Sequence, residues 1–129
     1  MPMTKYVVDW FHRADEDLQM VDLALKEDGP VNPVCFHAQQ AAEKYLKGFL
    51  AFHAQNVRKI HDLKALLQEC QNVDPSFREL DEDTAVLNRF YMTSRYPDDT
   101  PEFSSAECRE ASEAAVRIKE FVLKKMDDK

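Results

Sequence analysis

The stretch from Cys35 to Leu50, CFHAQQAAEKYLKGFL, limits the possible folds more than any other part of the chain. At about 100° per residue, its apolar residues cover one broad sector of a helix and its polar residues lie opposite. A helix with so wide an apolar sector belongs at the centre of a helical domain. The apolar sector contains Cys35, Ala38, Ala42, Tyr45, Leu46, Phe49, Phe52 and His53, and the polar side contains Gln40, Lys44 and Lys47, with His37 at its edge.

The rest of the chain also has the composition of helices. Only two glycines occur among 129 residues, whereas turn-rich β architectures need more glycine and fewer straight-chain residues. Apolar spacing and stop signals predict helices over about 5–26, 33–55, 63–70, 75–94 and 104–125. We therefore expect one domain, residues 1–129, with an all-α fold: an up-and-down bundle of about five helices, four long and one short.

Short polar residues mark the expected helix starts, because a side-chain oxygen there accepts a bond from a free backbone N–H group. Gly29 is expected to relieve the last turn of the first helix, before Pro30 stops it. Gly48 lies inside a helix, where glycine costs about 1 kcal/mol against alanine, and this indicates close packing. The predicted caps are Thr4, Asn32, Asp62, Asp74 and Ser104, the last paired with Glu107 in a capping box.

The net charge of −7 argues against a general nucleic-acid coat protein. The charge is uneven, however: residues 35–64 contain five lysines and arginines against two carboxylates. Any phosphate-binding site is therefore expected in this segment.

The three cysteines, Cys35, Cys70 and Cys108, are widely separated and lack CxxC spacing. This pattern predicts buried free thiols in a reducing compartment. We see neither a signal-peptide pattern nor an apolar run of membrane-spanning length. The expected location is therefore the cytoplasm, without membrane association.

His61 and Arg95 are the first candidates for chemistry. Each is expected at a helix end, where loops of a bundle can converge on the polar side of the helix over 33–55. A histidine and an arginine beside lysines suit phosphate binding or, with acid–base histidine chemistry, RNA cleavage. The alternative is structural: Arg95 complements a helix dipole and His61 closes a turn.

Gln40, Lys44 and Lys47 are candidates to line a nucleotide pocket. The alternative is that they form the solvent-facing side of the helix, with Lys47 paired to Glu43 one turn away. Tyr91 and Tyr96 are candidates for stacking on a base, and core packing is the alternative for Tyr91. Four histidines occur without HxxxH or HExxH spacing, so no metal site is expected, and no cofactor beyond a nucleotide ligand.

Three segments, in this order, resemble the HEPN domain, whose name means higher eukaryotes and prokaryotes nucleotide-binding. The segments are FHAQQAAEKYLK over 36–47, IHDL over 60–63, and Tyr91-x-x-x-Arg95-Tyr96-Pro97. The resemblance covers nearly the whole chain and implies a five-helix bundle that is commonly a homodimer. The prokaryotic branch with an AxEKxLK helix and an RYP loop is often encoded beside a minimal nucleotidyltransferase, in toxin–antitoxin or two-component systems.

Many other HEPN proteins are metal-independent RNases with an R-x4-6-H motif, and this sequence lacks that motif. No arginine lies five to seven positions before His12, His37, His53 or His61; the nearest substitute is Lys47 before His53. Lysine lacks the planar fork of arginine.

The resemblance therefore favours a nucleotide-binding or partner-docking subunit without a confident catalytic residue. The alternatives are a metal-independent RNase toxin that uses a displaced His61 and Arg95 pair, and a purely structural dimeric adaptor. The expected nucleotide or RNA contacts are Gln40, Lys44, Lys47, His61, Arg95 and Tyr96.

Overall fold

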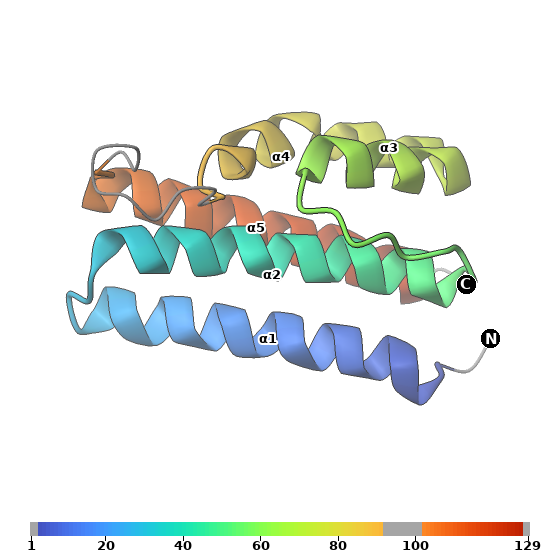
Figure 1. Cartoon of the computed structure of the whole chain (residues 1–129), viewed down its shortest axis with the longest axis horizontal. Coiled ribbons are helices and arrows are strands. Elements are labelled where there is room, and N and C mark those ends of the chain that lie inside the picture. The colour runs from blue at the N-terminus through green and yellow to red at the C-terminus, as the bar shows by residue number, and fades with distance from the viewer. Residues whose placement is uncertain (1–2, 92–101, 128–129) are drawn as a thin grey trace.

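The computed structural model describes residues 3–91 and 102–127, and the candidates Arg95 and Tyr96 lie outside these ranges. The described residues form helices and no strand, which confirms the predicted all-α bundle of five α-helices (Figure 1). The elements are α1 (Lys5–Lys26), α2 (Val31–Phe52), α3 (Leu63–Val73), the 3-10 helix η1 (Pro75–Leu80), α4 (Asp81–Asn88) and α5 (Ser105–Asp127).

Helix α2 is the central element, as the sequence predicts. It contacts α1, α3, α4 and α5, and in Figure 1 it lies between α1 on one side and α3 and α4 on the other. Tyr45, Leu46 and Phe49 on this helix are completely buried. Burial extends further round α2 than its apolar sector, because Gln39, Glu43 and Lys47 are buried as well. Of the predicted polar side, Lys47 is buried, whereas Gln40, Lys44 and His37 are half-buried.

Most of the predicted helix starts are confirmed. The side chains of Thr4, Asp62 and Asp74 each accept a bond from a backbone N–H of the following helix. Ser104 and Glu107 exchange two bonds in the expected capping box, at 3.1 and 3.0 Å. The prediction for Asn32 is wrong. Helix α2 begins earlier, at Val31, and the Asn32 side chain accepts a bond from Phe103 N at 2.9 Å, which ties α2 to the segment before α5.

The prediction of one long helix over 75–94 is also wrong. The segment starts as the 3-10 helix η1, with Phe77 N bonded to Asp74 O, and continues as α4 only to Asn88. The Asn88 side chain accepts a bond from Leu63 N and donates one to Asp62, so the end of α4 is fixed to the start of α3. The first turn of α4 is acidic, with Asp81, Glu82 and Asp83, and Asp83 binds Arg117 of α5 at 2.9 Å.

Gly48 permits the close packing of α1 against α2, as its position in the helix indicates. A Cβ atom at this residue would lie 2.8 Å from Cε1 and 2.9 Å from Cζ of Phe11. Real Cβ atoms do not approach a ring so closely, so a side chain at this position requires the buried Phe11 ring or one of the two helices to shift.

The turns after α1 and α2 use left-handed residues other than glycine. Asp28 has φ 53° and Ala54 has φ 55°, whereas Gly29, expected to relieve this turn, does not have a positive φ. Aspartate tolerates the left-handed region because its side chain bonds locally. Alanine has no such compensation, so Ala54 is a strained residue in the segment that leads to His61.

Replacing Ala54 with glycine is expected to raise the free energy of unfolding by about 0.5–1 kcal/mol. Glycine adopts a positive φ without the steric cost of a Cβ atom, and this outweighs its greater freedom in the unfolded chain. Urea unfolding followed by circular dichroism measures the change. Ala85→Gly, in the exposed face of α4, is the matched control and is expected to destabilise.

All three cysteines are buried and free, as predicted. Burial raises the pKa of the Cys35, Cys70 and Cys108 thiols, which keeps them protonated and unreactive. Among the described residues, no helix is long and apolar enough to cross a membrane.

Candidate functional site

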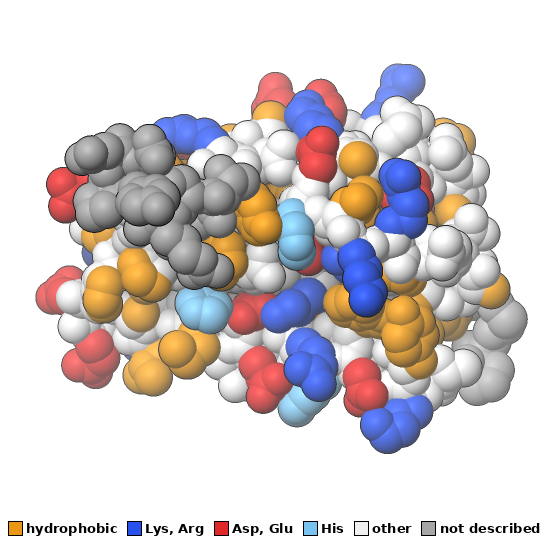
Figure 2. Space-filling model, viewed as in Figure 1, with side chains coloured by type: hydrophobic (Ala, Val, Ile, Leu, Met, Phe, Trp, Pro, Cys, Tyr) orange, Lys and Arg blue, Asp and Glu red, His pale blue; other side chains and the backbone are white. Residues whose placement is uncertain are grey.

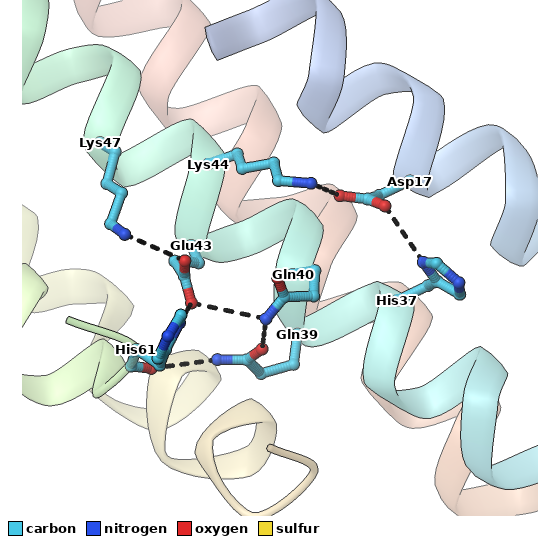
Figure 3. A network of polar contacts seen from close by, with 8 residues as sticks. All are labelled: Asp17, His37, Gln39, Gln40, Glu43, Lys44, Lys47 and His61. Carbon is cyan, nitrogen blue, oxygen red and sulfur yellow. Dashed lines mark hydrogen bonds and ion pairs between the residues drawn. The ribbon is translucent and has the colours of Figure 1, made fainter. Parts of the chain in front are cut away.

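Glu43 is the centre of a polar network on the buried side of α2 (Figure 3). Its side chain is only 5% exposed, and its two oxygens bind different partners. Oε2 accepts a bond from Lys47 Nζ at 3.0 Å, and Oε1 lies 3.0 Å from His61 Nδ1. The amide of Gln40 adds a longer contact to Oε1 at 3.5 Å. The buried carboxylate is thus compensated by a cation and two further polar groups, as a charge in this position requires.

Gln39 links the same network to the backbone of the next segment. It is completely buried, and its Oε1 accepts a bond from Gln40 at 2.7 Å while its Nε2 donates to the His61 carbonyl at 3.1 Å. His61 is therefore held at its ring and at its backbone. Sequence reasoning missed Gln39 and Glu43 as site residues. The available signal was their spacing, because Gln39, Glu43 and Lys47 recur every four residues along one side of the helix.

His61 is the member of this network that faces solvent, with 48% of its side chain exposed. Its ring stacks on Tyr91, with centroids 4.7 Å apart and planes 16° apart. The two rings line an open hollow of about 430 Å³ together with Ile60, Asp62 and Asn88. Two amides at the start of α3 are occupied by side chains, since Lys64 N donates to Asp62 and Leu63 N donates to Asn88.

Lys44 belongs to a second, separate ion-pair centre. Its Nζ binds Oδ2 of the buried Asp17 of α1 at 2.6 Å, and Oδ1 of Asp17 lies 3.1 Å from His37 Nδ1 (Figure 3). Lys44 and Lys47 are therefore both paired with buried carboxylates. The pairing of Lys47 with Glu43 is the one that the alternative interpretation of the sequence expects.

Lys47 connects the network to α1. Its side chain is 6% exposed, and Nζ lies 5.7 Å from the centre of the Trp10 ring. An ammonium group over an indole ring is attracted by the electron density of its face. Figure 2 shows the resulting surface, on which Lys, Arg, Asp, Glu and His side chains gather over the middle of the molecule.

The arrangement is suited to hold one histidine in a defined orientation. A carboxylate at Nδ1 favours the tautomer with its proton on Nδ1. Nε2 is then the nitrogen of the half-exposed ring that is left to contact a ligand. His61 thus resembles the oriented histidines of acid–base and phosphate sites.

The structure brings together only part of the predicted site. Gln40, Lys47 and His61 meet at Glu43, whereas Lys44 lies at Asp17. Within residues 3–91 and 102–127, no group of three His, Cys, Asp or Glu side chains is placed to hold a metal ion.

Comparison with known proteins agrees with this architecture. Fold and site define a small helical-bundle domain with a polar network on its central helix. A model of the HEPN domain matches residues 7–126, so the chain belongs to the HEPN domain family. No curated protein sequence matched the chain.

Two solved structures are similar over almost their whole length. TT1696 from Thermus thermophilus is 33% identical, with a TM-score of 0.82 over 95% of this chain and 99% of that chain. ST0689, described as an archaeal HEPN homologue, is 28% identical, with a TM-score of 0.75 over 95% of this chain and 98% of that chain.

Proposed function

We propose that this HEPN domain binds the phosphate of a nucleotide at the hollow beside His61. The observation that carries the proposal is the fixation of the half-exposed His61 ring between buried Glu43 and Tyr91. Glu43 and Lys47 neutralise each other, so protonation of His61 gives these three groups one net positive charge. A protonated imidazole donates a charge-assisted hydrogen bond, which is among the strongest contacts to a phosphate oxygen.

The other candidate residues have distinct roles in this proposal. Gln40 and Lys47 hold the Glu43 carboxylate, and Gln39 holds the backbone of His61. Lys44 stays paired with Asp17, which neutralises it, and makes no direct bond to the ligand. Arg95 and Tyr96 are proposed, from the HEPN resemblance alone, to add a guanidinium and a stacking ring.

The proposed setting is a two-protein system. The RYP segment resembles HEPN proteins that pair with a minimal nucleotidyltransferase, as toxin–antitoxin or two-component systems, and commonly form homodimers. We propose the same partner and the same self-association for this chain. The setting predicts a reading frame for a short nucleotidyltransferase next to the gene of this chain, and sequencing of the neighbouring genes tests it.

His61→Asn is expected to weaken ATP or GTP binding by about tenfold or more, measured by calorimetric titration. Asparagine retains a polar group but cannot carry the charge, and a hydrogen bond to a charged group contributes about 1.5–3 kcal/mol. His12→Asn is the matched control, because His12 is an exposed histidine on α1. Absence of nucleotide binding in the unmodified chain, with and without the partner, would refute the proposal.

The pairing of Glu43 with His61 also favours a second candidate function, a metal-independent RNase that uses His61 as acid–base residue. The same variant distinguishes the two functions. An RNase cleaves RNA in the presence of a chelator and arrests growth on expression, and both effects disappear in His61→Asn. If the chain is a binding subunit, neither the unmodified chain nor His61→Asn cleaves RNA or arrests growth.

A further inference from the structure

A second aromatic hollow lies at the other end of the Glu43 network. It is formed on α1 by Tyr6, Asp9, Trp10 and Arg13, and its volume is about 230 Å³. The rings of Tyr6 and Trp10 meet edge to face, with centroids 6.1 Å apart, and Tyr6 is 56% exposed. A hollow of this size is smaller than a typical pocket for a complete small ligand, about 300–1,000 Å³. It suits one part of a larger ligand.

The two hollows are joined by consecutive contacts. His61 Nδ1 lies 3.0 Å from Glu43, Glu43 lies 3.0 Å from Lys47 Nζ, and Nζ lies 5.7 Å from the Trp10 ring centre. A stacked strand rises about 3.4 Å per nucleotide. The path of contacts from the His61 ring to the Trp10 ring is therefore no longer than about four stacked nucleotides.

Each hollow combines an aromatic face with a group that binds phosphate. The first has Tyr91 and His61, and the second has Tyr6, Trp10 and the exposed guanidinium of Arg13. Aromatic rings bind bases by stacking irrespective of sequence, and arginine adds both a stacking plane and a phosphate contact. Figure 2 shows hydrophobic side chains next to Lys and Arg side chains toward the end of α1 where the chain begins.

We infer that the α1 hollow is a second base-binding subsite, and that the ligand contains two bases joined through phosphates. One base stacks at Tyr91 and His61, and the other stacks at Tyr6 and Trp10 with its phosphate on Arg13. This inference rests on the proposed function, because it extends the ligand from His61. The ligand is either a short single-stranded oligonucleotide or a dinucleoside polyphosphate.

Trp10 is the single tryptophan of the chain, so tryptophan fluorescence reports on the second subsite and on the Lys47 ammonium that lies over the same ring. Tetra-adenylate and diadenosine tetraphosphate represent the two ligand sources, and ATP is the one-base comparison. At least one two-base ligand is expected to quench Trp10 emission and to bind about tenfold more tightly than ATP. The ligand that does so shows whether the site takes an oligonucleotide or a dinucleoside polyphosphate.

Variants assign the effect to the α1 hollow. Tyr6→Ala and Arg13→Ala, both exposed positions, are each expected to weaken the two-base ligand about tenfold and to leave ATP binding unchanged. Arg78→Ala removes one exposed positive charge elsewhere and is expected to have no effect. Thermal unfolding of each variant checks that the fold is retained.

The outcomes separate this inference from the proposed function. If ATP binding depends on His61 while Tyr6→Ala and Arg13→Ala change nothing, the second subsite is refuted and the proposed function stands. A two-base ligand that binds no more tightly than ATP, or that does not quench Trp10, also refutes the subsite. If a two-base ligand depends on Tyr6 and Arg13 but not on His61, the bridging ligand and the phosphate site at His61 are both refuted.

Discussion

Replacing Glu43 with leucine is expected to lower the free energy of unfolding by about 3–5 kcal/mol, the range measured when one member of a buried ion pair is removed. The Lys47 ammonium, on a side chain that is 6% exposed, then loses the carboxylate that compensates it. The amide of Gln40 and the ring of His61 lose an acceptor in the same step. Urea unfolding followed by circular dichroism measures the change.

The double variant Glu43→Leu/Lys47→Met tests the cause of this loss. Removing the second charge as well leaves an apolar pair, which in other proteins is often as stable as the ion pair it replaces. We expect the double variant to recover most of the lost free energy, a strong coupling between the two positions. If Glu43→Leu alone changes the unfolding free energy by less than about 0.5 kcal/mol, the value typical of surface positions, the buried network does not exist in solution.

The second large effect is expected at Gly48. Gly48→Val places side-chain atoms where even a Cβ atom would lie 2.8 Å from the Phe11 ring, and Phe11 is itself buried. Overpacking of this kind costs about 1–3 kcal/mol, and we expect a value near 3 because both valine methyl groups add to the clash. The same urea titration measures it.

Gly48→Ala is a smaller substitution at the same position, and it separates the effect of packing on stability from that of helix propensity. Alanine is favoured over glycine in a helix interior by about 1 kcal/mol, so a net loss of stability in Gly48→Ala can only come from the contact with Phe11. Ala85→Val, on the exposed face of α4, is the control for a β-branched residue in a helix. A Gly48→Ala variant more stable than the unmodified chain would contradict the close packing of α1 on α2.

The parts of the fold that could be predicted depend on neighbours in the sequence. Thr4 caps α1 through a residue three positions away, and Ser104 and Glu107 cap α5 over the same separation. The prediction was wrong where a distant partner competed for a local role. Asn32 bonds to Phe103, 71 residues away, and Asn88 bonds to the start of α3 instead of continuing the helix.

The candidate site was predictable only in part of its membership. Gln40, Lys47 and His61 were recognised from their types and from the HEPN resemblance, and they do meet at one place. The sequence could not show whether these side chains are free or paired, because lysines on one side of a helix have the same spacing whether they face solvent or carboxylates. Glu43 was interpreted only as the helical partner of Lys47, although it is the residue that holds His61.

The sequence by itself determined the helical class, the central position of α2 and the starts of most helices, because periodicity and capping act within one or two turns. Only the tertiary structure decided which charges are neutralised. Lys44 binds Asp17, 27 residues before it, and His61 binds Glu43, 18 residues before it. Such pairs depend on how separately formed helices pack, and the free energy of a charge depends on whether that packing excludes water.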